Sequence, residues 1–391
     1  MTLARRNLLI LAMCQGLAMT AMTMVVTTIA LVGLKLYPVK ALATLPLALQ
    51  LGVTMLTAIP ASLLMRRFGR RAGFSLGAAS AIASALVSAY AIHLGSYLLF
   101  TVSAAAYGIA QSFSGFYRFA AVESAPPDWR AKAASLVLGG GVVAGLIGPT
   151  LAVFTSELVE GSRFAGTFIG IAALSAMSLF LLRGLRMPAM ADPAEARSGS
   201  VGELLTRPVF LVAMAAAAIG YASMSLVMTA TPLAMTAHHH DFPATAFVIQ
   251  WHVVAMYAPA FITGTLIQRW GVLHIILIGA AAMLATVAIN ETGTGLSEFW
   301  TALVLLGIGW NFMYVGGTTL LTEAYAPAER ARAQALNEFV MFALITAASL
   351  SSGLLQQTVG WSWVNLAVVP GLLAVSAAAL WLRSRRRAMM A

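Results

Sequence analysis

The sequence predicts an all-α membrane protein with twelve transmembrane helices, and three observations lead to that prediction. Of the 391 residues, 60% are hydrophobic and only 9% are charged, which is far from the composition of an average soluble domain. Apolar stretches of about 20 residues, the length that crosses a bilayer core, recur along the whole chain. The basic residues fall very unevenly between the two sets of alternating loops, as multi-pass membrane proteins require.

The apolar stretches can be placed in order along the chain. They lie at residues 7–33, 41–65, 72–94, 97–122, 131–155, 163–186, 208–236, 242–267, 272–290, 298–322, 333–356 and 361–382. No stretch has the short apolar core and small-residue cleavage site of a secretory signal. The first stretch is therefore expected to remain in the protein as a membrane span.

Membrane topology explains the net charge of +10. If both termini are cytoplasmic, all but three of the 23 Lys and Arg residues lie on or near the cytoplasmic side. The exceptions are Lys35, Lys40 and Arg163. The positive-inside rule then predicts cytoplasmic N- and C-termini, with the lipid bilayer as a partner and no nucleic-acid partner. The single cysteine, Cys14, excludes an internal disulfide.

Two loops of the first half recur in the second half. The loop of residues 62–71 corresponds to residues 264–271, and the loop of residues 123–133 corresponds to residues 323–333, both about 200 residues later. Two independent matches at nearly one offset indicate two homologous six-helix halves, as in transporters with parallel repeats. The predicted domains are an N-terminal bundle at 1–187, a polar cytoplasmic linker at 188–207 and a C-terminal bundle at 208–391.

The loop Arg67-Phe-Gly69-Arg-Arg71 resembles the signature loop of the major facilitator superfamily, and its weaker copy lies where that family repeats it. The resemblance covers the whole chain and implies two pseudo-symmetric bundles that work by alternating access. Arg66 and Gln268 replace a residue that is usually acidic in the family, where it joins a charge relay at the cytoplasmic face. By analogy, gating contacts between the domains are expected to hold the outward-open state, although membrane-surface anchoring explains the arginines equally well. The predicted gating residues are Arg67, Glu123, Arg130, Arg269, Glu323 and Arg330.

Two pairs of soft-metal ligands lie in the seventh and eighth stretches. Met224 and Met228 are four residues apart, as are His252 and Met256, so each pair lies on one face of a helix. Thioethers and imidazole suit Cu(I) and suit magnesium or calcium poorly. A methionine pair alone is more often apolar packing, but a histidine in a membrane helix is costly and usually functional. The two pairs together favour a copper site.

The combined Met-x-x-x-Met and His-x-x-x-Met pattern resembles the CcoA-like copper importers, a branch of the superfamily that also contains riboflavin importers. The resemblance implies a transporter of the bacterial inner membrane that imports copper for assembly of cbb3-type cytochrome oxidase, with a cytoplasmic copper acceptor as partner. Copper is then the transported substrate, and no permanently bound cofactor is expected. The alternative is import of riboflavin or another small organic solute, with the site at the aromatic residues around Tyr117 and Trp310.

Other polar and aromatic residues at membrane depth have two interpretations each. The fourth stretch contains Tyr107, Gln111, Phe116 and Tyr117, and the tenth contains Trp310, Asn311 and Tyr314. These residues could line a pocket for a planar ligand, but aromatic packing and interfacial anchoring explain most of them. His238, His239 and His240 lie on the outward side and could capture metal at the entrance, or could form a polar loop.

No enzyme is predicted. The chain has no phosphate-binding loop of the Gly-x-x-x-x-Gly-Lys-Ser/Thr type, so it has no apparatus for ATP-driven pumping. It also lacks Cys-x-x-Cys, which argues against a cytosolic metal chaperone.

Overall fold

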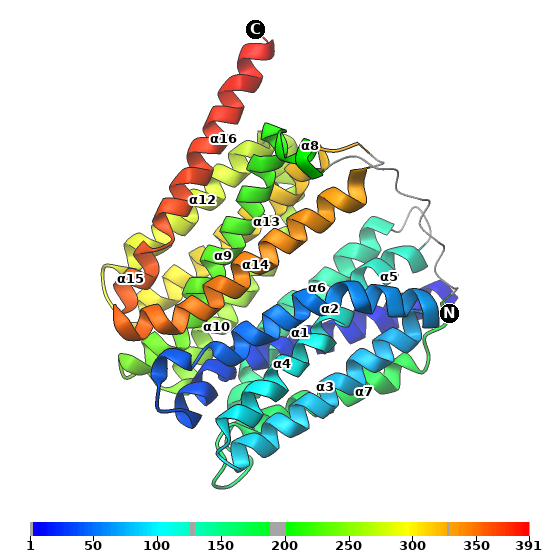
Figure 1. Cartoon of the computed structure of the whole chain (residues 1–391), viewed down its shortest axis with the longest axis vertical. Helices are drawn as coiled ribbons and strands as arrows, with labels where there is room; N and C mark the ends of the chain where they lie inside the picture. Colours follow the sequence, from blue (N-terminus) through cyan, green and yellow to red (C-terminus); the bar gives the residue numbers. More distant parts are fainter. Residues whose placement is uncertain (1–2, 126–129, 188–200, 327–328, 391) are drawn as a thin grey trace. The chain divides into compact units, whose positions relative to one another are not determined.

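The computed structural model of the chain describes residues 3–125, 130–187, 201–326 and 329–390, and every regular element within these ranges is a helix (Figure 1). The all-α prediction is confirmed. The helices form two compact units. Unit 1 comprises Met1–Ala191 and Met235–Val254, and unit 2 comprises Asp192–Ala234 and Ala255–Ala391. The domain boundaries predicted from the sequence stay a prediction, and residues 188–200 of the predicted linker lie outside the described residues.

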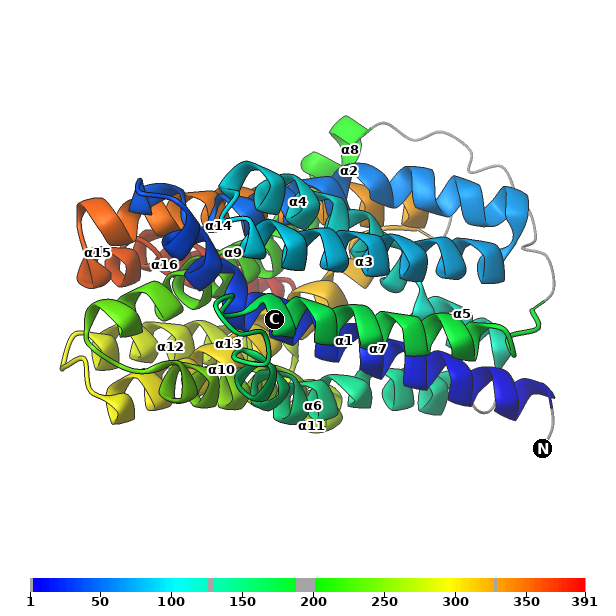
Figure 2. The same ribbon diagram turned by 90° about the horizontal axis from the view of Figure 1, so that it is seen from below.

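Unit 1 contains the first seven α-helices and most of a later one. Their bounds are α1 Leu3–Leu36, η1 Lys40–Leu42, α2 Leu45–Phe68, α3 Arg70–His93, α4 Tyr97–Ser114, α5 Tyr117–Ser124, α6 Arg130–Thr155, α7 Ala165–Leu182 and the greater part of α10 Phe242–Tyr257. In this unit α1 packs against α6 and α7, and α3 packs against α4 and α7. Figure 2 shows α3 and α7 side by side.

Unit 2 contains the remaining helices. Their bounds are α8 Val201–Leu205, α9 Pro208–Ala237, α11 Ala260–Trp270, α12 Val272–Asn290, α13 Leu296–Thr322, α14 Arg330–Thr358, α15 Trp361–Leu366 and α16 Val369–Met390. The helix α12 packs against α13 and α16. Glycine allows α13 to approach α9, because a Cβ on Gly317 would lie 2.7 Å from the backbone nitrogen of Ala217.

Nine helices in the described ranges are long and apolar enough to cross a membrane, and a bent helix pair adds a tenth candidate. These candidates coincide with ten of the twelve predicted stretches, and the multi-pass membrane prediction is confirmed. The fourth stretch differs because the helix is interrupted between Ser114 and Tyr117, which separates α4 from α5. The fifth stretch corresponds to α6, of which Gly139–Thr155 is the apolar part whose side chains the structure describes.

The two copies of the signature loop have the same backbone geometry. Gly69 joins α2 to α3 with φ 84° and ψ 158°, and Gly271 joins α11 to α12 with φ 87° and ψ 148°. A positive φ strongly favours glycine, because a Cβ clashes with the backbone in this region. The repeated glycine therefore makes the same one-residue turn between helices in each unit.

Candidate functional site

The predicted copper ligands lie on two helices and are all buried. Met224 and Met228 lie one turn apart on α9 and are 3% and 8% exposed. His252 and Met256 lie one turn apart on α10 and are 0% and 6% exposed. The three methionines belong to unit 2 and His252 belongs to unit 1, so the convergence of both pairs on one ion stays a prediction. Within the described ranges, no group of three or more His, Cys, Asp or Glu side chains is arranged to hold a metal.

The backbone of the histidine run ends a helix. His239 has a φ of 63°, its N–H donates to the Thr236 carbonyl, and the N–H of His240 donates to the Met235 carbonyl at 2.9 Å. These two bonds form a Schellman cap at the end of α9. The side chains of His238 and His239 are exposed. Metal capture by this run stays a prediction, and the cap is a role that the sequence alone did not suggest.

The span formed by α10 and α11 is bent by 44° at Ala258 and Pro259. Proline has no N–H, and its ring clashes with the carbonyl four residues earlier, so Pro259 favours a break in the helix at this point. Asn311 of α13, which is 2% exposed, donates through Nδ2 to the carbonyl of Met256 at 2.7 Å. The Thr263 hydroxyl of α11 lies 2.7 Å from Asn311 Oδ1 and 2.7 Å from the Pro259 carbonyl. Asn311 therefore joins the two halves of the bent span.

Four aromatic rings from three helices form a cluster in unit 2, which we call the ring cluster: Tyr221 of α9, Tyr257 of α10, and Trp310 and Tyr314 of α13. Trp310 and Tyr314 are stacked with centroids 5.1 Å apart and planes inclined by 6°. Tyr221 meets Trp310 edge-on at 5.2 Å, and Tyr257 meets it edge-on at 6.0 Å. These are the favoured geometries of aromatic pairs.

The ring cluster includes two of the residues that the sequence suggested for a planar ligand. The i, i+4 spacing of Trp310 and Tyr314 on one helix is the signal that predicts their contact. Tyr221 and Tyr257 were not assigned to this group, because their positions depend on how α9 and the bent span pack. Asn311 holds the bent span and so has a structural role beside the cluster.

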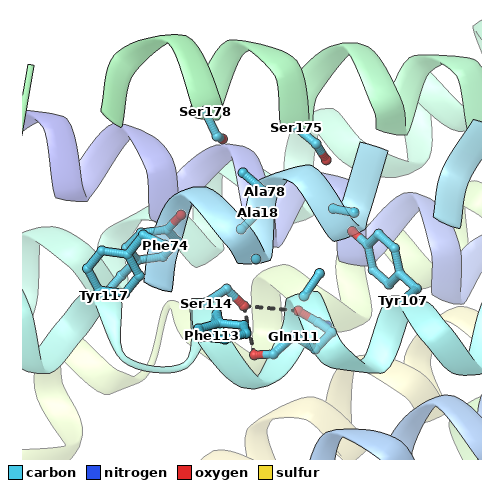
Figure 3. Close-up of a pocket in the computed structure, with 13 residues that line it drawn as sticks. Ala18, Phe74, Ala78, Tyr107, Gln111, Phe113, Ser114, Tyr117, Ser175 and Ser178 are labelled. Carbon is cyan, nitrogen blue, oxygen red and sulfur yellow. Dashed lines mark hydrogen bonds between the residues drawn. The ribbon is translucent and has the colours of Figure 1, made fainter. Parts of the chain in front are cut away.

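Three of the residues singled out in the fourth stretch surround a small space. Tyr107, Gln111 and Tyr117 line a cavity of about 30 Å³ between α1, α3, α4, α5 and α7 of unit 1 (Figure 3). Ser114 donates to the Gln111 carbonyl at 3.0 Å beside this cavity. A space of this size accommodates a water molecule, whereas pockets for drug-sized ligands have volumes of about 300–1,000 Å³. This cavity is therefore too small for a flavin ring in this structure.

In unit 1, the predicted gating residue Glu123 pairs with Arg70. The Nε of Arg70 lies 2.9 Å from Glu123 Oε2, and its NH2 contacts the other carboxylate oxygen. Arg70 is the first residue of α3 after the Gly69 turn, and its side chain is only 3% exposed. Arg67 is exposed beside the Phe68 ring, and the side chain of Arg130 lies outside the described part.

The ion pairs of unit 2 differ from those of unit 1. Glu323 pairs with Arg386 at 2.8 Å. Arg207 donates to both carboxylate oxygens of Glu329 at 2.7 and 2.8 Å, and the Ala326 N–H donates to Glu329 at 2.9 Å. These hydrogen bonds, led by the one from Arg207, lower the pKa of Glu329 to about 2. Arg269 and Arg330 are exposed, and gating by the predicted residues stays a prediction.

Comparison with known proteins gives both a family and named relatives. The family model of the Major Facilitator Superfamily matches residues 11–289 and 214–390. The riboflavin transporter RfnT of Brucella anthropi is 39% identical over 373 residues, which cover 94% of this chain and 94% of the relative. The uncharacterised MFS-type transporter YdeG of Bacillus subtilis is 27% identical over 391 residues, covering 96% of this chain and 90% of the relative.

Proposed function

The chain belongs to the Major Facilitator Superfamily, and from this premise we propose that it imports riboflavin, or a closely related flavin, by alternating access. The observation that carries the proposal is the similarity to RfnT, which extends over 94% of both chains at 39% identity. A relationship over nearly the full length covers the helices of unit 1 and those of unit 2. It therefore supports a shared substrate class better than a local motif does.

The chemistry of riboflavin fits the composition of the spans. Riboflavin has a flat isoalloxazine ring system and a polar ribityl chain, and neither part carries a strong charge. An uncharged ring loses little on leaving water, provided that its polar atoms find hydrogen-bond partners. Aromatic residues in the membrane core, such as Trp310 and Tyr314, are suitable contacts for such a ring.

The proposed location is the bacterial inner membrane, with both termini in the cytoplasm. The support is the uneven distribution of the 23 basic residues, of which only Lys35, Lys40 and Arg163 fall on the outward side in this orientation. Gating by Glu123, Glu323 and the arginines of the repeated loops belongs to the same proposal. In the structure Glu123 pairs with the buried Arg70 within unit 1.

Copper is the second candidate substrate, and one observation favours it: Met224, Met228, His252 and Met256 are all buried on continuous helices. Neutral thioethers can bind a soft cation without losing a proton. A cytoplasmic copper acceptor is needed only in this case. Burial is also what apolar packing of methionine produces, and the named relative is a riboflavin transporter, so riboflavin is the preferred substrate.

Parallel uptake assays test the proposal. Bacteria that lack their own riboflavin uptake would express the full chain, and accumulation of labelled riboflavin and labelled copper would be measured against an empty vector. We expect riboflavin accumulation well above the vector and copper accumulation equal to it. Copper accumulation that disappears in Met228→Leu and His252→Leu, with membrane expression intact and no riboflavin uptake, would establish the second candidate instead. Met228→Leu keeps the approximate volume while it removes the sulfur.

A further inference from the structure

We propose that the ring cluster of unit 2 binds the flat heteroaromatic ring of the transported solute, and that Trp310 Nε1 donates a hydrogen bond to a ring carbonyl. This inference rests on the proposed function, because it assigns the site that holds the flavin ring. The residues concerned are Tyr221, Tyr257, Trp310 and Tyr314.

The arrangement of the four rings supports a site for a planar molecule. Trp310 and Tyr314 are nearly parallel, at 6°, and Tyr221 stands at 77° to both of them. One wall of the cluster is thus a parallel aromatic pair, and another is perpendicular to it. A flat ring can stack on the first wall and direct its edge toward the second, which are the two favoured aromatic geometries.

The indole of Trp310 has an unused hydrogen-bond donor. Its side chain is 5% exposed, and Nε1 has no hydrogen-bond partner among the described residues. A buried indole N–H usually has a partner, because an unmade bond costs the desolvation of the donor. The pyrimidine portion of isoalloxazine carries two carbonyl oxygens, either of which could accept this bond.

Access to Trp310 depends on the neighbouring tyrosines. Tyr221, Tyr257 and Tyr314 are half-buried, whereas Trp310 is 5% exposed. Tyr257 is the last residue of α10 and directly precedes the bend at Ala258 and Pro259. A change in this bend would move the Tyr257 ring relative to Trp310, which it meets edge-on at 6.0 Å.

The charge of the cluster agrees with a neutral ligand. Its four side chains are uncharged, and they supply phenol hydroxyls and an indole N–H as the polar groups. Such a set can recognise a flat ring with carbonyl acceptors. It offers no thioether, imidazole or carboxylate, so a bare metal ion would find no suitable ligand in the four rings.

Equilibrium binding to the purified full-length chain in lipid nanodiscs tests the inference. Flavin fluorescence is quenched when the ring stacks on indole or phenol, so the quenching reports binding. The chain is titrated with riboflavin and with lumiflavin, which has the ring but no ribityl chain. Trp310→Phe keeps an aromatic ring and removes the N–H. We expect it to weaken the binding of both flavins by about three- to tenfold, the value of one hydrogen bond.

Trp361→Phe is the matched control. Trp361 of α15 is also 5% exposed, and its Nε1 also has no partner within the described residues. It packs against Phe299 of α13, outside the ring cluster. We expect this variant to bind both flavins as the wild type does. Tyr314→Leu, at a half-buried position, provides a second variant if Trp310→Phe does not fold, and we expect a loss of about three- to tenfold.

The possible results separate this site from the proposed function. If the wild type binds riboflavin and folded Trp310→Phe and Tyr314→Leu bind it equally well, the ring site is wrong while the proposed function stands. A loss of affinity for riboflavin but not for lumiflavin, or an equal loss in Trp361→Phe, also overturns the ring site. If the wild type neither binds nor transports riboflavin, the proposed function itself fails.

Discussion

Asn311 of α13 donates a hydrogen bond of 2.7 Å to the carbonyl oxygen of Met256, the penultimate residue of α10. In a continuous helix the Ala260 N–H would donate to this carbonyl, and among the described residues no such bond bridges the break at Ala258 and Pro259. Asn311 Oδ1 in turn contacts the Thr263 hydroxyl on the other side of the bend. A single buried amide thereby stabilises a bend that the helix backbone cannot stabilise alone.

Replacing Asn311 by Leu should destabilise unit 2. The Met256 carbonyl would stay buried without its partner, which costs about 1–3 kcal/mol of the free energy of unfolding. Thermal unfolding of the purified chain, followed by circular dichroism, measures the effect. Thr318→Val is a suitable control on the same helix, because the Thr318 hydroxyl donates to the carbonyls of Tyr314 and Val315, which both belong to α13 itself. Identical unfolding of Asn311→Leu and the control would contradict the role assigned to Asn311.

Neutralising Glu123 should cost more stability than neutralising Glu323. Glu123→Gln weakens a bidentate pair with Arg70, whose side chain is 3% exposed, whereas Glu323→Gln affects Arg386, which is 31% exposed. A buried cation that loses its partner costs about 1–3 kcal/mol, and a surface pair contributes about 0–1 kcal/mol. Denaturation of both single variants tests this order. Equal losses of unfolding free energy in the two variants would show that the burial of Arg70 does not increase the cost of removing its partner.

If both carboxylates also gate the cycle, neutralising them together should favour the inward-open state. Accessibility of single cysteines on the inward side of each variant would then rise, provided that the buried Cys14 is first replaced by Ala. Unchanged accessibility in Glu123→Gln/Glu323→Gln would count against gating by these residues.

The pair of Arg207 and Glu329 should make stability depend on pH in the acid range. The folded-state pKa of Glu329 is about 2, below the value of about 4.3 for an unfolded chain. The contribution is therefore complete above the unfolded-state pKa and is lost as the pH falls from about 4.3 toward 2. Glu329→Gln should have a shallower decrease in Tm across this interval than the wild type. Parallel pH profiles of the two proteins would refute the assignment.

The proposed topology places the α9–α10 turn on the outward side of the inner membrane and the end of α16 in the cytoplasm. In a Cys14→Ala background, a cysteine at the exposed His238 should react with a membrane-impermeant thiol reagent in intact cells. A cysteine at Arg385 should react only after the membrane is permeabilised. The reverse pattern would contradict the orientation inferred from the basic residues.

Much of the fold could be predicted because it depends on properties that are local in sequence. Hydropathy located the spans, and the repeated loops located the equivalent turns, where Gly69 and Gly271 have nearly the same φ. The partner of Glu123 was not predicted, because the direction of an arginine side chain depends on the helix that begins after Gly69. The sequence also does not reveal that Arg70 is the buried member of the Arg-rich loop.

The candidate site was harder to predict than the fold. The spacing of Met224 and Met228 is the same whether the side chains bind a metal or pack in an apolar core, so the motif alone does not decide the substrate. Three of the four ring-cluster contacts involve residues from different helices, and they form only when α9 and the bent span pack on α13. Tertiary packing therefore determines which residues form the ring cluster, and hydrophobic periodicity in the sequence does not predict it.

The most direct test of riboflavin transport is counterflow in liposomes that contain only the purified chain. Vesicles are loaded with unlabelled riboflavin and diluted into a trace of labelled riboflavin, so that exchange is measured without knowledge of the coupling ion. We predict a transient accumulation of label in riboflavin-loaded vesicles and none in vesicles loaded with buffer or copper. Accumulation no greater than in protein-free liposomes, with the chain folded and inserted, would contradict the account.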